Sequence, residues 1–119
     1  MKYVFLFCGT AEDQAAYDAL TPEQLRERYA EVGRWFARHR ERLGHGNQLQ
    51  GPETATAVSF EDGRPGGKPM VKDGLFLEGK ELVGGYTEVE VADLDEALAM
   101  ARTWPGGGTV EIRPVLVTR

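Results

Sequence analysis

A short, wholly apolar segment near the start of the chain sets the strongest limit on the fold. Residues 3–8, Tyr-Val-Phe-Leu-Phe-Cys, are aromatic, β-branched or aliphatic at successive positions, and Gly9 ends the run. Such a run predicts a central strand that is covered on both faces. The 119 residues suffice for a single domain, residues 1–119, with a core that needs no disulfide. We expect helices on one face of the sheet and a second subunit on the other.

The first half of the chain also carries signals for one long helix. Thr21 can cap its start, Pro22 suits the first helical position, and apolar residues follow at helical spacing. We predict a helix from about Pro22 to Leu43, which Gly44 and Gly46 end. Residues 10–20 predict a loop with at most a helical turn, and residues 48–60 predict a strand region broken at Gly51-Pro52.

A hairpin and a second strand–helix–strand unit follow. The turn-forming residues 61–67 predict a return into a short edge strand at residues 69–72. Residues 86–91 alternate between apolar and polar side chains, which indicates a strand with one packed face. Asp93 is placed to cap a second helix that Pro105-Gly106 ends, and residues 109–117 predict the last strand.

The predicted order is therefore β-α-β-hairpin-β-α-β. It predicts the α+β class and a ferredoxin-like split βαβ sandwich, with four antiparallel strands and both helices on one face. Since the strand at residues 3–8 is apolar on both faces, the bare face should be buried in a homodimer in which two sheets pack together.

Composition excludes several classes of function. The formal net charge of −5 argues against direct nucleic-acid binding, because phosphate binding requires clustered cations. Six arginines crowd the first long helix, but glutamates are interleaved with them, which favours a solvated helix face. Cys8 is the single cysteine, so no intrachain disulfide can form and a cytoplasmic location is expected. The run at residues 3–8 is too short for a membrane segment. We expect no metal and no cofactor, because ligand spacings and phosphate-binding loops are missing from the sequence.

Three separated motifs resemble one known family. Residues 73–81, Asp-Gly-Leu-Phe-Leu-Glu-Gly-Lys-Glu, precede Gly84-Gly85-Tyr86, and residues 93–97 and 110–114 supply the other two motifs. Together they resemble the DGPF group of the YCII-related proteins, whose signature is approximately Asp-Gly-Pro-Phe-x-Glu-x-Lys-Glu. Leu75 stands where that signature has Pro, and Gly79 where the group usually has Thr. These departures loosen the turn and remove one hydroxyl.

The resemblance implies a dimeric α/β barrel. It also implies kinship with small dimeric enzymes such as muconolactone isomerases, and for the wider family a His–Asp pair has been proposed as the active site. Proteins resembling the DGPF group often accompany extracytoplasmic-function sigma factors. Fold analogy of this kind does not define a reaction.

The charged motif at residues 73–81 supplies most of the candidate site. The predicted catalytic residues are Asp73, Lys80 and Glu81. The predicted ligand-binding residues are Phe76, Glu78, Tyr86, Arg113 and His39. If the protein is an enzyme, we expect proton transfer on a small organic acid or lactone-like molecule, with Glu81 or Asp73 as the base and Lys80 or Arg113 holding the negative charge.

Each candidate also has a structural interpretation. Asp73 can be a turn residue alone, and Glu78 with Lys80 can be an exposed ion pair. Arg113 can pair with Glu88 or Glu90 across strands, and His39 can be packed against the sheet. The alternative function is a non-catalytic accessory or regulatory partner protein beside a sigma factor, in place of a protein that binds a small molecule.

Overall fold

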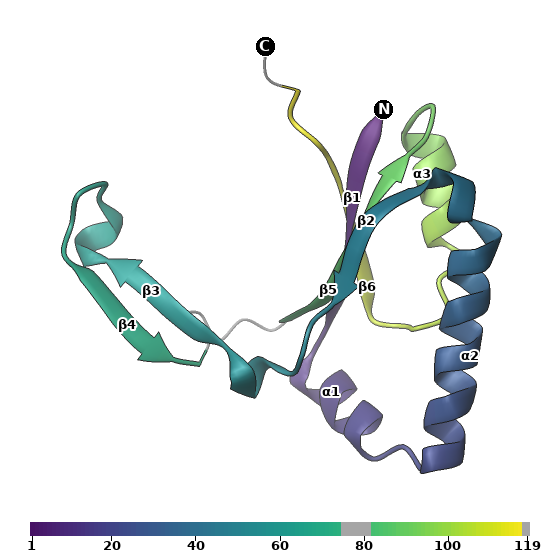
Figure 1. The fold of residues 1–119 in the computed structure, drawn as a ribbon, viewed down its shortest axis with the longest axis horizontal. Helices are drawn as coiled ribbons and strands as arrows, with labels where there is room; N and C mark the ends of the chain where they lie inside the picture. The colour runs from purple at the N-terminus through teal and green to yellow at the C-terminus, as the bar shows by residue number, and fades with distance from the viewer. Residues whose placement is uncertain (75–81, 118–119) are drawn as a thin grey trace.

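A four-stranded antiparallel sheet forms the body of the protein (Figure 1). In the computed structural model, which describes residues 1–74 and 82–117, the strands lie in the order β2-β5-β1-β6. Their bounds are Leu43–Gln48 for β2, Leu82–Glu90 for β5, Lys2–Gly9 for β1 and Thr109–Pro114 for β6. The first and third strands of this sheet in chain order are central and the second and fourth are at the edges, which is the split βαβ order predicted from the sequence.

Two helices, α2 (Pro22–Arg38) and α3 (Leu94–Ala101), cover one face of the sheet. The core lies between them and β1 and β5. Phe5 and Val89 are fully buried, and Trp35 of α2 is 3% exposed. The indole N–H of Trp35 donates to the hydroxyl of Thr103 at 3.0 Å, so the polar atom of this buried side chain has a hydrogen-bond partner. Phe7 stacks on Trp104 with ring centroids 4.2 Å apart, and this pair closes the core toward β6.

The predicted end of the long helix was wrong. Helix α2 ends at Arg38, a short 3₁₀ turn spans Arg40–Arg42, and residues 43–48 form strand β2 instead of a helix end and loop. The prediction of a strand region at residues 48–60 was correct only in part. The main sheet contains residues 43–48 instead, and the strand that forms within 48–60, at residues 56–60, belongs to the hairpin. Pairing with β5 imposes the extended conformation on a segment that contains two glycines and no β-branched residue.

Residues 10–20 form a helix and not a loop. Helix α1 spans Ala11–Asp18. Thr10 and Asp13 form a reciprocal capping box: the Thr10 hydroxyl accepts from the Asp13 N–H at 3.1 Å, and the Asp13 carboxylate accepts from the Thr10 N–H at 2.8 Å. The hydroxyls of Tyr17 and Tyr29 lie 2.6 Å apart and join α1 to α2.

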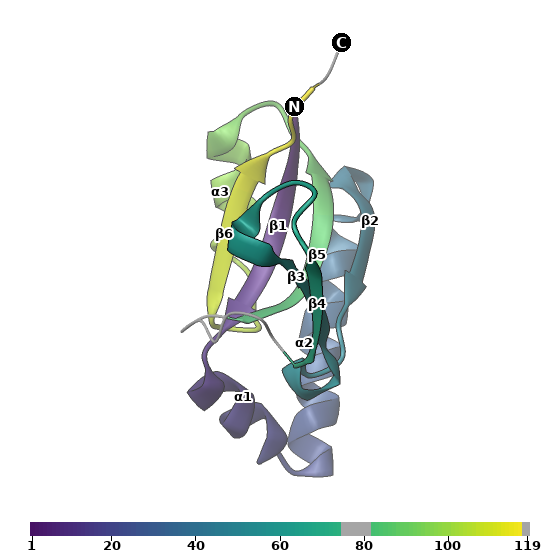
Figure 2. The same cartoon turned by 90° about the vertical axis from the view of Figure 1, so that its left-hand side faces the viewer.

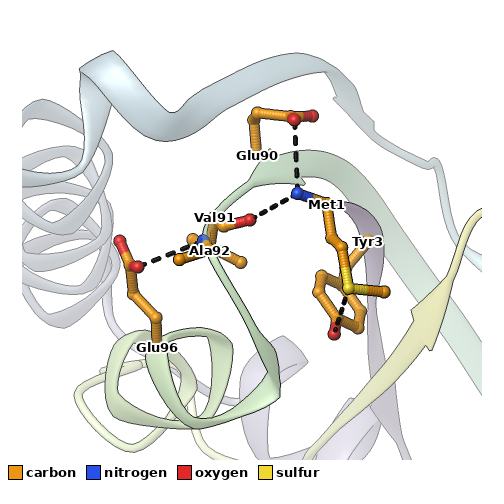
Figure 3. Close-up of polar contacts among 6 residues, drawn as sticks. All are labelled: Met1, Tyr3, Glu90, Val91, Ala92 and Glu96. Atoms are coloured by element: carbon orange, nitrogen blue, oxygen red, sulfur yellow. Dashed lines mark hydrogen bonds and ion pairs between the residues drawn. The ribbon is translucent and has the colours of Figure 1, made fainter.

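The N-terminus and α3 meet at one end of the sheet (Figure 3). The terminal ammonium of Met1 donates to the Val91 carbonyl at 2.6 Å and lies 3.5 Å from the Glu90 carboxylate. Asp93 caps α3 as predicted and accepts from the Glu96 N–H at 2.9 Å, while Glu96 accepts in return from the Ala92 N–H. Strand β6 ends at Pro114 and not at Val117, and its last paired residue, Pro114, is opposed by Tyr3 of β1.

The predicted hairpin forms a separate two-stranded sheet. Strands β3 (Thr56–Phe60) and β4 (Pro69–Asp73) pair with each other. Short 3₁₀ turns at Pro52–Thr54 and Glu61–Gly63 precede and follow β3. Figures 1 and 2 show the hairpin projecting on the side of the main sheet that lies opposite α2 and α3.

Candidate functional site

The face of the main sheet opposite α2 and α3 carries the candidate site, and we call it the open face (Figure 2). Strand alternation decides which side chains lie there, since directly opposed residues of antiparallel strands point the same way. Val4 of β1 is opposed by Glu88 of β5 and by Arg113 of β6. In the next row, Leu6 is opposed by Tyr86 and by Glu111. The open face therefore has an apolar centre along β1 with polar side chains on both sides.

A chain of polar contacts joins β2 to β5 at one side of this apolar centre. The side-chain amide of Asn47 donates to the Tyr86 hydroxyl at 3.1 Å and lies 3.3 Å from Nε2 of His45. The His45 and Tyr86 rings are 6.1 Å apart between centroids. When the amide donates to both, His45 Nε2 is the acceptor and its ring proton is on Nδ1. Two groups capable of proton transfer, the imidazole and the phenol, are thus held by one amide.

A β-bulge in β2 places His45 on this face. Leu43 is opposed by Val89 and Gly46 by Thr87, so Gly44 and His45 together oppose the single residue Glu88. The extra residue reverses the alternation between Leu43, which packs on the core, and His45. The Glu88 carboxylate accepts from the His45 backbone N–H at 3.3 Å and lies 4.0 Å from the Lys2 ammonium.

Gly46 allows β2 to come this close to β5. A Cβ atom at this position would lie 2.6 Å from the Tyr86 carbonyl oxygen and 2.9 Å from the Thr87 Cα. Both neighbours are backbone atoms, which cannot move aside as a flexible side chain can. A glycine is therefore required for the approach that brings Asn47 against Tyr86.

The other side of the open face carries Glu111 and Arg113 on β6. The interpretation of Arg113 as the partner of Glu88 or Glu90 was wrong, because β1 lies between β5 and β6. Two strand spacings put the two backbones about 10 Å apart. Within residues 1–74 and 82–117, no ion pair involves Arg113, and its side chain is exposed.

The predicted site residues divide into three groups. Tyr86 and Arg113 lie on the open face, in adjacent rows. Asp73 is exposed at the end of β4, opposed by Thr56 in the hairpin. The other members of the charged motif lie outside the described residues: Phe76, Glu78, Lys80 and Glu81.

His39 lies on the opposite side of the sheet from Tyr86 and Arg113. It caps α2, is 9% exposed, and its ring centroid is 4.9 Å from that of Trp35. Its Nε2 lies 3.5 Å from the Thr103 hydroxyl, and its buried Nδ1 has no hydrogen-bond partner among the described residues. Burial lowers the pKa of His39, and the nearby charges of Arg38 and Arg42 lower it further. These contacts agree with the alternative interpretation, a histidine packed into the helix layer.

Sequence reasoning missed three residues of the open-face cluster: His45, Asn47 and Glu88. His45 stands between two glycines, a setting that is typical of a solvated loop residue. The spacing of His45 and Asn47 two residues apart is the one signal that could have indicated a shared strand face. The bulge that directs both toward Tyr86 depends on the register with β5, which is not a local property.

The His–Asp pair implied by the family resemblance is not formed in the described structure. The polar contacts of His45 involve Glu88 and Asn47, and that of His39 involves Thr103. Across the described part of the chain, no group of three or more His, Cys, Asp or Glu side chains is arranged to hold a metal ion. The groups available on the open face are therefore an imidazole, a phenol, an amide and charged side chains around an apolar centre.

The fold and this face define a small α+β protein of split βαβ topology, with one sheet face that is not covered by residues 1–74 or 82–117. Comparison with known families assigns the chain more closely: the YCII-related domain matches residues 1–119. The chain belongs to the YCII-related family, as its motifs predicted. An uncharacterised protein of Rhizobium meliloti (strain 1021) is 38% identical over 68 residues, which cover 54% of this chain and 52% of that protein. The match thus spans about half the length of this relative. None of the described helices is long and apolar enough to cross a membrane.

Proposed function

We propose that the open face binds a small organic acid, with a second copy of the chain closing over the face. The observation that carries the proposal is the Asn47–Tyr86 hydrogen bond of 3.1 Å, beside His45 and across Leu6 from β6. It fixes a polar group at the edge of an apolar surface that none of the described helices covers. Ligand sites typically combine such an apolar surface with a few placed polar groups.

The dimensions of the face and the Arg113 guanidinium favour a carboxylate ligand. Val4 and Leu6 offer an apolar surface for the carbon skeleton, and the Arg113 guanidinium offers a planar fork that suits a carboxylate. The backbones of β5 and β6 are about 10 Å apart, so a molecule with one ring or a short chain reaches from Tyr86 to Arg113. His45 and Tyr86 would then contact the end of the ligand opposite the carboxylate.

A homodimer would complete this site. Half-buried Val4, Leu6 and Cys8 lie along the centre of a sheet face whose other side is filled by the core. A second sheet packed on this face would exclude water from the bound acid and strengthen its contacts with Arg113. The motif at residues 73–81 directly precedes β5 in the sequence.

A thermal-shift screen tests the proposal. The probes are small monocarboxylic and dicarboxylic acids, with inorganic phosphate as a comparison anion. We expect at least one acid to raise the Tm, because binding to the folded state alone stabilises it. That acid is then titrated against the variants Tyr86→Phe and Arg113→Gln, whose Kd should rise by about 10-fold or more, the equivalent of about 1.4 kcal/mol.

The matched controls are Tyr29→Phe and Arg34→Gln on α2, which make the same chemical changes on the helix side of the protein. Their Kd should stay unchanged. If the open-face variants bind the acid as tightly as these controls do, the open face is not the binding site.

A further inference from the structure

The β3–β4 hairpin projects from the main sheet as an arm (Figure 1). We call residues 56–73 the arm. Its two strands pair only with each other, so each strand has an outer edge without a neighbouring strand in the described structure. An isolated two-stranded hairpin is marginally stable in water, and an unpaired strand edge is a template for association. A surface that packs against the arm would therefore stabilise it.

One face of the arm is apolar. Val58 is opposed by Val71 and Phe60 by Pro69, and these four residues form the arm stripe. Val58, Phe60 and Val71 are 55%, 50% and 71% exposed. The opposite face is mixed, with Ala57 opposed by Lys72 and Ser59 by Met70, which is 53% exposed. Contiguous apolar side chains at this exposure mark an interaction surface more often than they mark plain solvent contact.

The whole chain exposes more surface than a compact monomer of its size. Its accessible area is 8963 Å², against about 6,400 Å² expected for a folded monomer of this mass. Its radius of gyration is 16.6 Å, against about 13.5 Å expected. The excess of roughly 2,500 Å² equals what one subunit contributes to a large obligate dimer interface. An occupant of about the size of this protein itself accounts for it.

A second apolar segment lies on the same side of the sheet. Val115, Leu116 and Val117 follow β6 and are 37%, 84% and 84% exposed. The N–H of Val115 donates to the Lys2 carbonyl at 2.9 Å, which starts this segment beside β1. In Figure 1 both the arm and this segment project away from the helices. The arm stripe and residues 115–117 are thus two exposed apolar surfaces of one chain.

We propose that the arm clasps a second copy of this chain that is seated on the open face, with the arm stripe packed on residues 115–117 of that copy. The inference rests on the dimer of the proposed function and names how the second copy is held. In a two-fold dimer each contact occurs twice, so each copy both clasps and is clasped. The two apolar surfaces that are exposed in one chain are then buried together, and both arms gain a packed face.

Analytical ultracentrifugation tests the clasp. The variant V58E/V71K removes the centre of the arm stripe but keeps an opposite-charge pair across the two strands, so the hairpin itself should persist. We expect the unsubstituted chain to be a dimer at micromolar concentration and this variant to raise the dimer Kd by about 100-fold or more, since two large apolar contacts are lost in each arm. The matched control A57E pairs with Lys72 on the opposite face of the arm and should change the Kd by less than about 3-fold.

Photo-crosslinking identifies the surface that the arm meets. p-Benzoylphenylalanine in place of Phe60 should crosslink to residues 115–117 of another copy, which a mixture of ¹⁴N- and ¹⁵N-labelled chains distinguishes from a crosslink within one chain. A monomer at micromolar concentration, an unchanged Kd in V58E/V71K, an equal loss in A57E, or crosslinks confined to one chain would each overturn the clasp. If the dimer Kd is unchanged in the arm variants while Tyr86→Phe still weakens acid binding, the clasp alone is overturned. The proposed acid site on the open face is then retained.

Discussion

The two faces of the main sheet use the same strands in different ways. On the covered face, Phe5 and Val89 are fully buried beneath α2 and α3. On the open face, the neighbouring residues Val4 and Leu6 are only half-buried, and polar side chains flank them on both sides. The covered face is completed by its own chain, whereas the open face keeps apolar area in reach of solvent. The residues of the core are concentrated on one face, and the exposed polar side chains flank the other.

The histidines divide in the same way. His39 is enclosed in the helix layer, where burial lowers its pKa and its Nδ1 lacks a partner among the described residues. His45 is exposed on the open face and is held by Asn47 and by the backbone contact with Glu88. A buried imidazole with a lowered pKa is often taken as a sign of function. Here the surroundings of His39 are those of a packed residue, and the exposed histidine is the one beside a phenol on an open surface.

The largest expected difference between the two faces is in the adjacent residues Phe5 and Leu6. Phe5→Ala should lower the free energy of unfolding by about 3–5 kcal/mol, because it removes a fully buried ring from the core. Leu6→Ala should cost the isolated chain about 1 kcal/mol, since Leu6 is already partly exposed. Urea denaturation measures both values, and Phe5→Leu, at about 1.5 kcal/mol or less, serves where Phe5→Ala does not fold.

Measuring both variants at two protein concentrations sharpens the comparison between the covered face and the open face. If a second copy covers the open face, the cost of Leu6→Ala should grow between about 1 μM and about 50 μM protein, because association contributes to stability by mass action. The cost of Phe5→Leu should stay constant over the same range. Equal costs for the two residues at every concentration would remove the distinction between the faces.

The second prediction concerns the strand that brings His45 and Asn47 to the open face. Gly46→Ala places a Cβ against the Tyr86 carbonyl and the Thr87 backbone, so β2 must move away from β5. We expect a loss of about 1–3 kcal/mol in the free energy of unfolding. Amide hydrogen exchange should speed up in residues 43–48 and not in β1.

The matched control is Gly33→Ala. Gly33 lies in the middle of α2, and nothing comes within 4 Å of a Cβ placed there. This change should stabilise the protein by about 0.5–1 kcal/mol, because alanine loses less backbone entropy in a helix than glycine does. A Gly46→Ala variant that is as stable as the unsubstituted chain would show that β2 does not need this close approach.

How far the sequence predicted the fold depends on whether the deciding signal was local. Thr21 and Asp93 cap the helices they were predicted to cap, because a cap needs only the residues of the first turn. The same local logic was available for α1, whose capping box Thr10–Asp13 is visible in the sequence and was overlooked. Strand β2 had no such signal: its residues form a strand because β5 offers a partner.

The candidate site follows the same division. Tyr86 and Arg113 could be placed on strand faces from alternation alone. That they share the open face follows from both β5 and β6 pairing with β1, and the absence of an ion pair between Arg113 and Glu88 follows from the strand order. His45 and Asn47 depend on a bulge, which is a property of the register between two strands whose paired residues run from Leu43 with Val89 to Gln48 with Gly85. The sequence thus predicted which strands bear the site but not which edge strand completes it.

The smallest expected effect is the pH dependence that comes from His39. Its pKa is lowered in the folded protein, first by burial and then by Arg38 and Arg42, while in the unfolded chain it titrates near the ordinary value of about 6.5. Between these two values the unfolded state binds more protons than the folded state, so the free energy of unfolding rises with pH through this window. The contribution is complete above about pH 6.5 and is lost as the pH falls toward the folded-state pKa. Among the groups around the ring, Thr103 does not titrate, and Arg42 is paired with Glu96 at 3.0 Å.

Urea denaturation across about pH 5 to 8 measures this dependence. His39→Gln should remove the part of the slope that lies just below about pH 6.5, whatever its effect on stability at neutral pH. Arg38→Gln should narrow the window, because it removes one of the two charges that disfavour the imidazolium. A slope that is identical in His39→Gln and in the unsubstituted chain would mean that His39 accepts a proton as readily in the folded state as in the unfolded one. The covered face would then be open enough to hydrate this ring, and the contrast between the two faces would be smaller than the burial of His39 indicates.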